Sequence, residues 1–308
     1  MILAAITTYK RPPEMLDRAV KSVLSQTFQD WHLLIVDDSP QDYNLRNEVK
    51  SMIENLRAKD KRITYIQHDK NYGASHARNT ALNFALKNNY EFIAYLDDDD
   101  EWLPDKLDKQ IKKCQDCGEN LALVYCDCYS IDDDTGNIMK KLPDALSPEG
   151  NVYKNLFQSN FIAMIALIRT KSLFNIGGFD EKMKALEDWE AWIRLAKNYE
   201  FAYINESLVK VHLHSGEHVG GNILNLINAC EIIISKNKDY LAHDKLSHWY
   251  LLVRLTYLYR ENGQYKKCLI TLFKALSLRP CKISIILKAL FTIKFKNWLR
   301  SKIFFWKE

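Results

Sequence analysis

Short apolar runs alternate with helix-periodic segments through the first 120 residues, and this alternation limits the folds open to the chain. Each run is a predicted strand, and each precedes a segment with apolar residues at helical spacing. Strands that alternate with helices of this kind predict βαβ units and a mainly parallel sheet. We therefore expect an α/β fold. The four runs are ILAAITT (2–8), HLLIVDDS (32–39), ITYIQHD (63–69) and EFIAYLDDDD (91–100).

Polar or acidic residues follow three of these four predicted strands. They occur in ITTYKR, VDDS and LDDDD. In open α/β sheets ligands bind beyond the carboxyl ends of the strands. The sequence therefore predicts a ligand site at this edge of the sheet.

The pattern changes after about residue 120. Residues 121–142 read as two strands joined by a turn at 134–136, and residues 161–179 supply another strand and a glycine turn. A helix is predicted at 185–198, with acids at its start, and a strand at 201–214. We predict that residues 1–221 form the catalytic domain and residues 222–308 a helical region.

Two features mark the predicted helical region. Residues 245–280 resemble a single tetratricopeptide-type helix pair, which is too little for a solenoid and predicts a small appendage. Residues 281–308 hold seven Lys or Arg against one Glu, interleaved with apolar and aromatic residues. A basic amphipathic tail suits an anionic membrane surface, although a terminal helix covering the core is the alternative.

Composition narrows the class of protein. A net charge of +4 gives no whole-chain case for nucleic-acid binding. The seven cysteines are odd in number, which suits a reducing compartment, and we read Cys114, Cys117, Cys126 and Cys128 as structural rather than as zinc ligands. No leader or spanning segment is recognisable. We expect a cytoplasmic protein, which would be peripheral on the inner face of the plasma membrane if the tail binds lipid. The sequence leaves open whether the chain forms a homo-oligomer.

Five acidic residues, 97–101, lie at the end of the fourth predicted strand, in YLDDDDEW. If the strand continues, Asp97 and Asp99 point to one face and Asp98 to the other. Two carboxylates on one face can share a hard divalent ion whose shell substrate phosphates complete. Mg²⁺ or Mn²⁺ is the predicted cofactor, because both prefer oxygen ligands.

Six short motifs together resemble the inverting family 2 glycosyltransferases of the GT-A fold. Each motif is weak alone, but they occur in order over roughly residues 1–215. The resemblance implies a Rossmann-like, mainly parallel mixed sheet that binds a nucleotide-diphosphate sugar. The motifs are ITTYKRP, VDDS, NYGASHARNTAL, YLDDDDEW, GGFDE and LEDWEAWIRL.

The resemblance implies which residues bind the donor nucleotide. The turn after the first strand matches the one that holds base and ribose, and Asp38 matches the aspartate that hydrogen-bonds the base, uracil. Arg78 matches the arginine that lines the nucleotide pocket. Asp97 matches the family residue that faces the ribose. The implied donor set is Thr7, Thr8, Tyr9, Arg11, Asp38, Arg78, Asp97 and Asp98.

The resemblance also implies the metal, catalytic and acceptor residues. Asp99 would bind the metal, with His214 completing the site; His212 stands where many relatives have a cation, so either histidine could face the metal. Asp188 matches the catalytic base, with Glu187 beside it, although acids are common in a first helical turn in any case. The implied acceptor and sugar contacts are Asp100, Trp189 and His212.

This site implies transfer of a hexosyl or N-acetylhexosaminyl group from a UDP-sugar to a glycan, glycolipid or glycoprotein hydroxyl, in bacterial surface polysaccharide or glycan assembly. A sugar nucleotidyltransferase is the first alternative, but it needs a glycine-rich phosphate loop and TTYKRPPE contains no glycine. A non-catalytic carbohydrate-binding or scaffold module is the second. The clustered acids argue against it, because a module without chemistry has no need of them.

Overall fold

A computed structural model describes residues 1–116, 118, 120–140, 147–162, 164–213 and 222–279. The chain divides into two compact units. The first unit comprises residues 1–151, 164–181 and 194–215, and the second comprises 152–163, 182–193 and 216–308. The second unit thus joins two internal segments to the C-terminal helices. The expected boundary at residue 221 stays a prediction.

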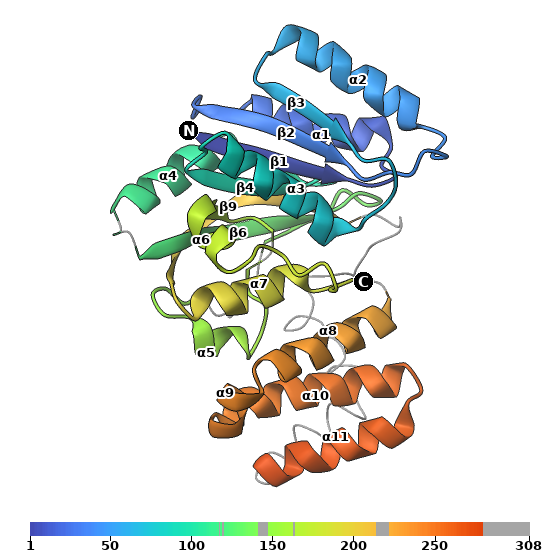
Figure 1. The fold of residues 1–308 in the computed structure, drawn as a ribbon, viewed down its shortest axis with the longest axis vertical. Helices are drawn as coiled ribbons and strands as arrows, with labels where there is room; N and C mark the ends of the chain where they lie inside the picture. The colour runs from blue at the N-terminus through green and yellow to red at the C-terminus, as the bar shows by residue number, and fades with distance from the viewer. Residues whose placement is uncertain (117, 119, 141–146, 163, 214–221, 280–308) are drawn as a thin grey trace. The chain divides into compact units, whose positions relative to one another are not determined.

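The first unit is built on one mixed sheet of nine strands (Figure 1). The strand order is β3-β2-β1-β4-β8-β6-β9-β5, and β7 pairs with β6. Parallel pairs join β1 to β2 and β4, β2 to β3, and β6 to β9. Antiparallel pairs join β5 to β9, β7 to β6, and β8 to β4 and β6. The predicted mainly parallel mixed sheet is confirmed. The strands are β1 (Ile2–Thr8), β2 (Trp31–Asp37), β3 (Ile63–Gln67), β4 (Phe92–Asp97), β5 (Glu101–Trp102), β6 (Leu121–Asp132), β7 (Ile138–Lys140), β8 (Leu167–Arg169) and β9 (Glu200–Leu213).

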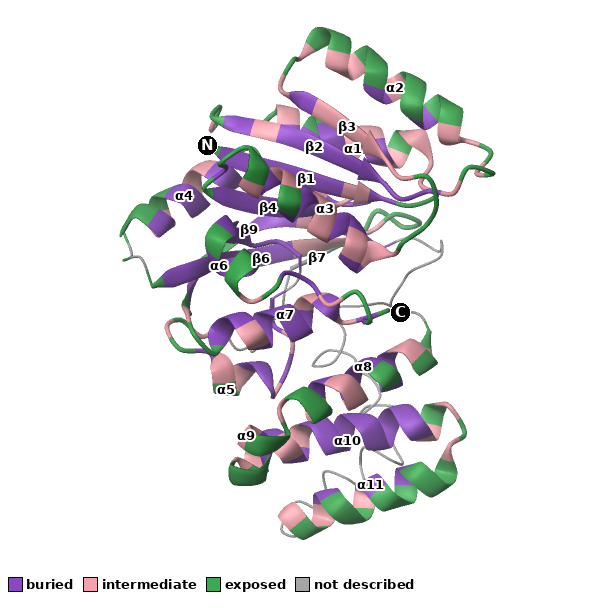
Figure 2. Cartoon of the chain, in the orientation of Figure 1, coloured by how far each residue is buried: buried purple, intermediate pink, exposed green. Residues whose placement is uncertain are grey.

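Helices follow the strands as the periodicity predicts. α1 begins at Pro13. Proline has no backbone N–H, and no hydrogen bond is lost at this position because the N–H groups of a first helical turn have no acceptor within the helix. α3 packs on β1, β2 and β4 and crosses in front of the sheet in Figure 1. The central strands are therefore buried on both faces, which is why they read as continuous apolar runs (Figure 2). The helices are α1 (Pro13–Leu24), α2 (Arg46–Lys59), α3 (Ala74–Lys87), α4 (Lys106–Asp116) and α6 (Thr170–Asn175).

The second unit is helical in the part that the structure describes. α10 is buried over most of its length and packs against α8, α9 and α11 (Figure 2). Asn222 and Asp244 cap α8 and α10 by accepting hydrogen bonds from backbone N–H groups of the first turn. α10 and α11 form the expected helix pair, whose tetratricopeptide-like nature stays a prediction. The helices are α5 (Tyr153–Leu156), α7 (Glu187–Ala196, ending in the first unit), α8 (Ile223–Lys236), α9 (Lys238–His243), α10 (Lys245–Glu261) and α11 (Tyr265–Leu278).

Two sequence expectations can be checked within the described ranges. None of the helices in the described ranges is long and apolar enough to cross a membrane. The five described cysteines (114, 126, 128, 230 and 268) are buried, and among the described residues no cluster of potential metal ligands includes them. Cys117 and the basic tail lie outside the described residues.

Candidate active site

The predicted ligand edge is formed by the carboxyl ends of β1, β2 and β4. Parallel pairing sets Thr8 beside Asp37 and Thr7 beside Asp97. The side chains that follow these strands therefore start from adjacent points of one sheet edge. The ligand site predicted at this edge stays a prediction.

β4 ends at Asp97, so the strand does not continue through the acidic run. Residues 98–100 form a turn in which the Asp100 N–H donates to the Asp97 carbonyl at 3.2 Å. The expectation that alternating strand faces would pair Asp97 with Asp99 is therefore wrong. Asp98, Asp99 and Asp100 are instead all buried, with 5%, 5% and 8% exposure.

Arginines contact this buried acidic turn. Arg11 Nε donates to Asp98 Oδ1 at 2.8 Å, and Arg11 Nη2 lies 3.2 Å from Asp99 Oδ2. Arg78 Nη2 donates to Asp97 Oδ1 at 3.1 Å. Since Arg11 follows β1 and Arg78 lies on α3, the turn is held from two directions. Two residues predicted to bind the donor nucleotide, Arg11 and Arg78, are thus brought together with the acidic run.

The loop after β1 carries backbone strain. Lys10 has a φ of 48°, in the left-handed region that side chains with a Cβ rarely occupy. Its N–H donates to Ser39 Oγ at 2.8 Å, and the neighbouring Tyr9 N–H donates to Asp98 Oδ2 at 3.3 Å. Strained residues of this kind persist where the surroundings hold them and often mark ligand sites.

Burial shifts the protonation of the turn. Desolvation raises the pKa of the Asp98 carboxyl to about 7; the Arg11 charge opposes this, and repulsion from Asp99 adds to it. Desolvation, followed by the charges of Asp99 and Asp97, also raises the pKa of Asp100 well above its usual value. The ionised turn is therefore short of positive charge despite two arginines. A cation would relieve this repulsion.

The acidic turn fits a divalent ion by its chemistry. Buried carboxylate oxygens are the ligands that Mg²⁺ and Mn²⁺ prefer. Over the described ranges, no three His, Cys, Asp or Glu side chains converge to hold a metal by themselves. An ion held by one or two carboxylates and by substrate phosphates needs no such cluster.

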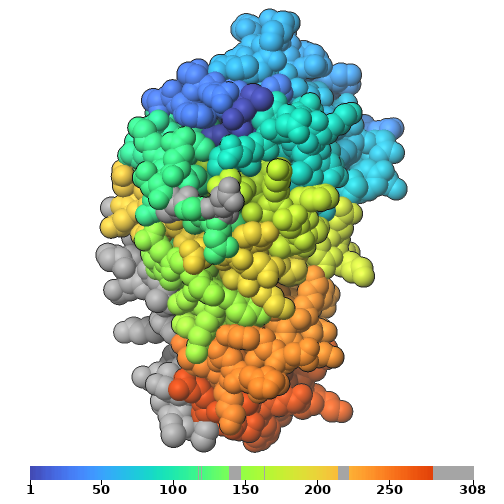
Figure 3. All heavy atoms as spheres, turned by 60° about the vertical axis from the view of Figure 1, so that its left-hand side comes forward, coloured from blue at the N-terminus to red at the C-terminus, as the bar shows by residue number. Residues whose placement is uncertain are grey.

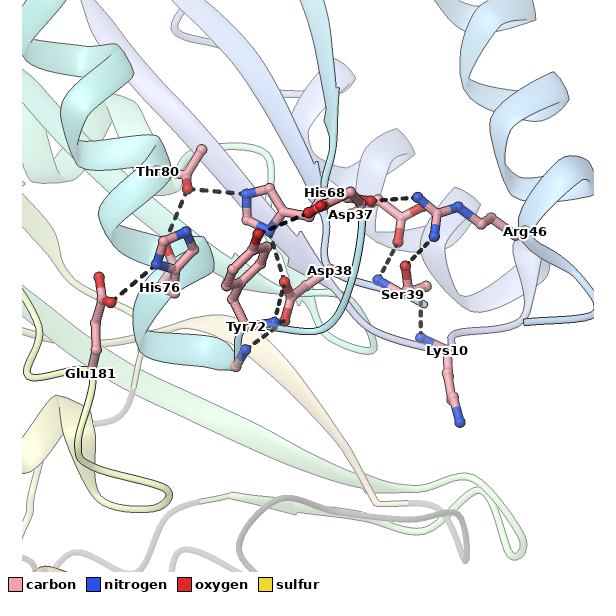
Figure 4. A network of polar contacts seen from close by, with 12 residues as sticks. Lys10, Asp37, Asp38, Ser39, Arg46, His68, Tyr72, His76, Thr80 and Glu181 are labelled. Carbon is pink, nitrogen blue, oxygen red and sulfur yellow. Dashed lines mark hydrogen bonds and ion pairs between the residues drawn. The ribbon is translucent and has the colours of Figure 1, made fainter. Parts of the chain in front are cut away.

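Asp38 anchors the loop before α3 (Figure 4). Its carboxylate accepts the N–H groups of Tyr72 and Gly73, the latter at 2.7 Å, and contacts His68 Nδ1 at 2.7 Å. Gly73 has a φ of 96°, which only glycine adopts without strain. Asp38 thus shapes the loop at the start of α3. Its predicted contact with the base stays a prediction.

Sequence reasoning missed a chain of contacts that extends from Asp38 (Figure 4). His68 Nε2 contacts Thr80 Oγ1 at 3.1 Å, and Thr80 Oγ1 donates to the His76 carbonyl. His76 Nδ1 lies 3.1 Å from Glu181, in the GGFDE motif. These residues connect the loop at β2 with residues about 140 positions away. The available signal was the position of His68 near the end of the predicted strand 63–69, which in the structure ends one residue before it.

His212 lies between two carboxylates. Its Nδ1 is 2.5 Å from Asp133 Oδ1 and its Nε2 is 2.7 Å from Glu101 Oε1, while its N–H donates to Asp100. Both ring nitrogens are therefore occupied, which contradicts a direct metal or sugar contact for His212 in this structure. His214 lies outside the described residues.

Arg18 on α1 is a second residue that sequence reasoning missed. Its Nη2 donates to the Asp99 carbonyl at 2.7 Å, and its Nη1 lies 3.6 Å from Asp133. Its spacing on α1 marked it only as a polar helix position. Arg18 thus ties the acidic turn to the hairpin of β6 and β7.

Asp188 and Glu187 begin α7, in the second unit. Asp188 Oδ1 accepts the Trp189 N–H at 2.7 Å, and its Oδ2 accepts Asn160 Nδ2–H at 3.0 Å. Leu186, directly before the helix, has a φ of 57°, and its carbonyl accepts the Glu190 N–H. A strained residue therefore sets the direction of the first turn. The positive end of the helix dipole favours an ionised carboxylate there.

Trp189 is fully buried, with 0% exposure. Its Nε1 donates to the Leu156 carbonyl at 2.7 Å, and the guanidinium of Arg254 lies over its ring at 4.0 Å. The prediction that Trp189 stacks on an acceptor sugar is therefore wrong in this structure, because no ring face is open. Its place in the core follows from the helical spacing that it shares with Trp192.

Comparison with known families identifies the family of this chain. The family model described as glycosyl transferase family 2 matches residues 4–177. The chain therefore belongs to glycosyl transferase family 2. The predicted family is confirmed.

Three relatives illustrate the range of the family. The chain is 28% identical over 250 residues to the uncharacterized glycosyltransferase MJ1057 of Methanocaldococcus jannaschii, covering 81% of this chain and 79% of the relative. It is 30% identical over 266 residues to the uncharacterized glycosyltransferase RC0461 of Rickettsia conorii, covering 83% of this chain but only 41% of the relative. It is 27% identical over 297 residues to the GalNAc(5)-diNAcBac-PP-undecaprenol beta-1,3-glucosyltransferase of Campylobacter jejuni. This match covers 89% of this chain and 88% of the relative.

Two solved structures share the fold. TarS residues 1–349 of S. aureus, in complex with UDP-GlcNAc, give a TM-score of 0.66 at 16% identity, covering 94% of this chain and 87% of the other. The mannosyltransferase PcManGT of Pyrobaculum calidifontis, in complex with GDP-Man and Mn²⁺, gives a TM-score of 0.60 at 15% identity. The match covers 98% of this chain and 83% of the other. These similarities confirm the predicted GT-A fold.

Proposed function

We propose that this protein is an inverting, metal-dependent glycosyltransferase that uses a nucleotide-diphosphate sugar, a UDP-sugar. It would transfer a hexosyl or N-acetylhexosaminyl group to a hydroxyl of a glycan, glycolipid or glycoprotein in bacterial surface glycan assembly. The observation that carries the proposal is the buried acidic turn 98–100, held by Arg11 at the end of parallel strands. The UDP-GlcNAc bound by TarS supports the choice of donor.

The donor would lie along the carboxyl edge of the sheet. Arg11 and Arg78 are cations at the acidic turn, and we expect them to face the phosphates of a donor. Thr7, Thr8 and Tyr9 would line the base and ribose. Asp38 would keep the glycine loop in place, and Asp97 would accept a ribose hydroxyl.

Asp99 would hold Mg²⁺ or Mn²⁺, which neutralises the charge that grows on the departing diphosphate. The Mn²⁺ of PcManGT supports this choice of ion. Asp100 would approach the sugar. The contribution of His214 stays a prediction.

Asp188 would act as the base. An acceptor hydroxyl gives its proton to the Asp188 carboxylate while its oxygen bonds to the anomeric carbon, and the bond from that carbon to the diphosphate breaks. Attack from the side opposite the leaving group inverts the anomeric centre, through an oxocarbenium-like transition state. Asn160 and the Trp189 N–H, which donate to the two carboxylate oxygens, would fix its direction. Glu187 would assist from the adjacent position.

A glycolipid acceptor is supported by the printed substrate of the Campylobacter relative, a diphosphoundecaprenol-linked glycan. Such an acceptor lies in a membrane, so we propose a cytoplasmic protein that works at the inner face. Binding through residues 281–308 stays a prediction, since they lie outside the described residues.

A panel of nucleotide sugars incubated with Mn²⁺ tests the proposal. We expect nucleotide-diphosphate release from one UDP-sugar, loss of release with a chelator, and faster release when an acceptor is added. Pyrophosphate release from a nucleoside triphosphate and a sugar phosphate would instead identify a nucleotidyltransferase. Binding of sugars without any turnover would identify a non-catalytic module.

A further inference from the structure

α11 packs on its neighbours by one face only. Cys268, Thr271 and Ala275 are buried, and Thr271 Oγ1 lies 3.0 Å from Thr256 Oγ1 of α10. Ala275 belongs to a core cluster with residues of α10 that include Trp249. The inner face therefore accounts for the attachment of α11 to the helical unit.

The opposite face of α11 exposes large apolar side chains. Tyr265, Leu269, Ile270 and Phe273 are 68%, 52%, 46% and 66% exposed. Tyr265, Leu269 and Phe273 follow the i, i+4, i+8 spacing that aligns side chains along a helix, and Ile270 lies beside them. Four of the ten exposed large hydrophobic residues in the described ranges thus lie on one helix of 14 residues. Scattered apolar residues are ordinary on a surface, but a contiguous group indicates a binding surface.

Positive charge accompanies this apolar face. Lys266, Lys267 and Lys274 are exposed on α11, although the Lys267 amine also lies 3.5 Å from Glu231 of α8, and the sequence contains no Asp or Glu from residue 262 to residue 279. The next 29 residues, 280–308, hold seven Lys or Arg and one Glu. A basic protein-binding helix would need an acidic partner, whereas an anionic lipid surface supplies both the charge and the apolar depth that this face needs.

We propose that the outer face of α11 docks onto an anionic lipid surface. Tyr265, Leu269, Ile270 and Phe273 enter the boundary between headgroups and acyl chains, and the three lysines contact lipid phosphates. A helix of 14 residues is about 21 Å long, too short to span a bilayer, so it lies in the plane of the membrane. The site lies on described residues outside the donor and base sites, and it does not depend on the proposed transfer reaction.

Co-sedimentation of the full chain with vesicles tests the proposal. We compare phosphatidylcholine vesicles with and without phosphatidylglycerol, using wild type and the double variant L269S/F273S. Wild type is expected to bind only the anionic vesicles, and less in high salt. The double variant is expected to bind about tenfold more weakly or worse, because each apolar side chain adds to partitioning. In the triple variant K266Q/K267Q/K274Q, the affinity for anionic vesicles is expected to fall about fivefold for each lysine that is replaced.

Helix α6 offers a matched control. Phe174 is 54% exposed and Lys171 is exposed on the same short helix. The variant K171Q/F174S therefore removes one apolar and one basic side chain from a different surface. It is expected to bind vesicles as wild type does. The variant K274Q/F273S, which removes the same kinds of side chain from α11, is expected to bind them more weakly.

Three results would overturn the proposal. Vesicle binding that L269S/F273S leaves unchanged would assign any membrane contact to residues outside α11. A change of oligomeric state in L269S/F273S, seen by light scattering without lipid, would identify a second copy as the occupant. A lower melting temperature of this variant without lipid, with vesicle binding unchanged, would show that the chain itself covers the face.

Discussion

The guanidinium of Arg254 on α10 lies 4.0 Å from the ring centre of Trp189, the residue that follows Asp188. Lys236 on α8 also reaches α7, where its Nζ lies 2.6 Å from the buried carboxylate of Glu190. Two C-terminal helices thus support the first turn of the helix that carries the proposed base. The C-terminal helices are part of the unit that holds Asp188, rather than a simple appendage.

We expect Arg254→Met to lower kcat while the KM for the donor stays the same. Methionine fills similar space, so thermal unfolding should change little, since a buried charge is costly to keep. The loss of the cation over Trp189 should loosen the Asp188 turn, and Arg254→Lys should retain more of the rate. A kcat equal to that of wild type in Arg254→Met would restrict Arg254 to a packing role.

Asp188→Asn is expected to bind donor normally and to lose about 10²-fold or more in transfer rate. The amide keeps the shape of the carboxylate but accepts no proton, which is the contribution of a general base. Asn160→Ala is the graded comparison, since it removes only the hydrogen bond to Asp188. Near-normal turnover in Asp188→Asn would exclude Asp188 as the base.

Asp99→Ala is expected to abolish the part of nucleotide affinity that depends on Mn²⁺. The variant removes the carboxylate proposed to hold the ion, and the neighbouring buried acids Asp98 and Asp100 have raised pKa values and bind a cation less well. Isothermal titration with UDP, with and without Mn²⁺, measures this difference. Asp108→Ala on α4, away from the acidic turn, serves as the control. An Mn²⁺ effect that survives in Asp99→Ala would show that another residue holds the ion.

Gly73→Ala is expected to raise the KM for the donor and to destabilise the fold by about 1–2 kcal/mol. A Cβ at residue 73 meets no atom within 4 Å, so the cost comes from its φ of 96° alone. The N–H of Gly73 would then lose its alignment with Asp38. Gly263→Ala, with a φ of 69° and equal free space, should cost similar stability and leave donor binding unchanged.

Lys106 predicts a dependence of stability on pH. Burial lowers the pKa of its amine to about 8, and its Nζ donates to Gln110 Oε1 at 2.7 Å. The unfolded chain therefore binds more protons at this site between about pH 8 and 10.5, so the free energy of unfolding rises with pH there. We expect this group to add about 2 kcal/mol of stability between pH 7.5 and 9.5.

Chemical denaturation at these two pH values measures the effect, with Lys106→Met as the reference. The difference between wild type and Lys106→Met removes the contribution of tyrosines and cysteines, whose pKa values are raised by burial in both proteins. Equal pH dependence in the two proteins would contradict the lowered pKa of Lys106.

Local sequence patterns predicted the sheet because their physical basis is local. Parallel strands buried on both faces need continuous apolar runs, and β1, β2 and β4 have them. The same strands end at Thr8, Asp37 and Asp97, so the edge that carries the polar residues was readable from the chain. The family motifs added residue roles, most of which remain predictions.

Side-chain contacts across long sequence separations were not readable. Strand alternation predicts one face for Asp97 and Asp99, but β4 ends at Asp97 and the acids turn toward Arg11. The position of Trp189 beside the proposed base predicts a contact with a sugar. It is buried because residues 65 positions later on α10 cover its ring.

The sequence by itself determined the order of strands and helices, the family and the place of the acids after β4, since each depends on neighbouring residues. The tertiary structure decided which charges meet. Arg11 reaches Asp98 over 87 positions, and His212 reaches Glu101 over 111. Such pairs depend on chain closure and on competition among partners, and no local spacing encodes them.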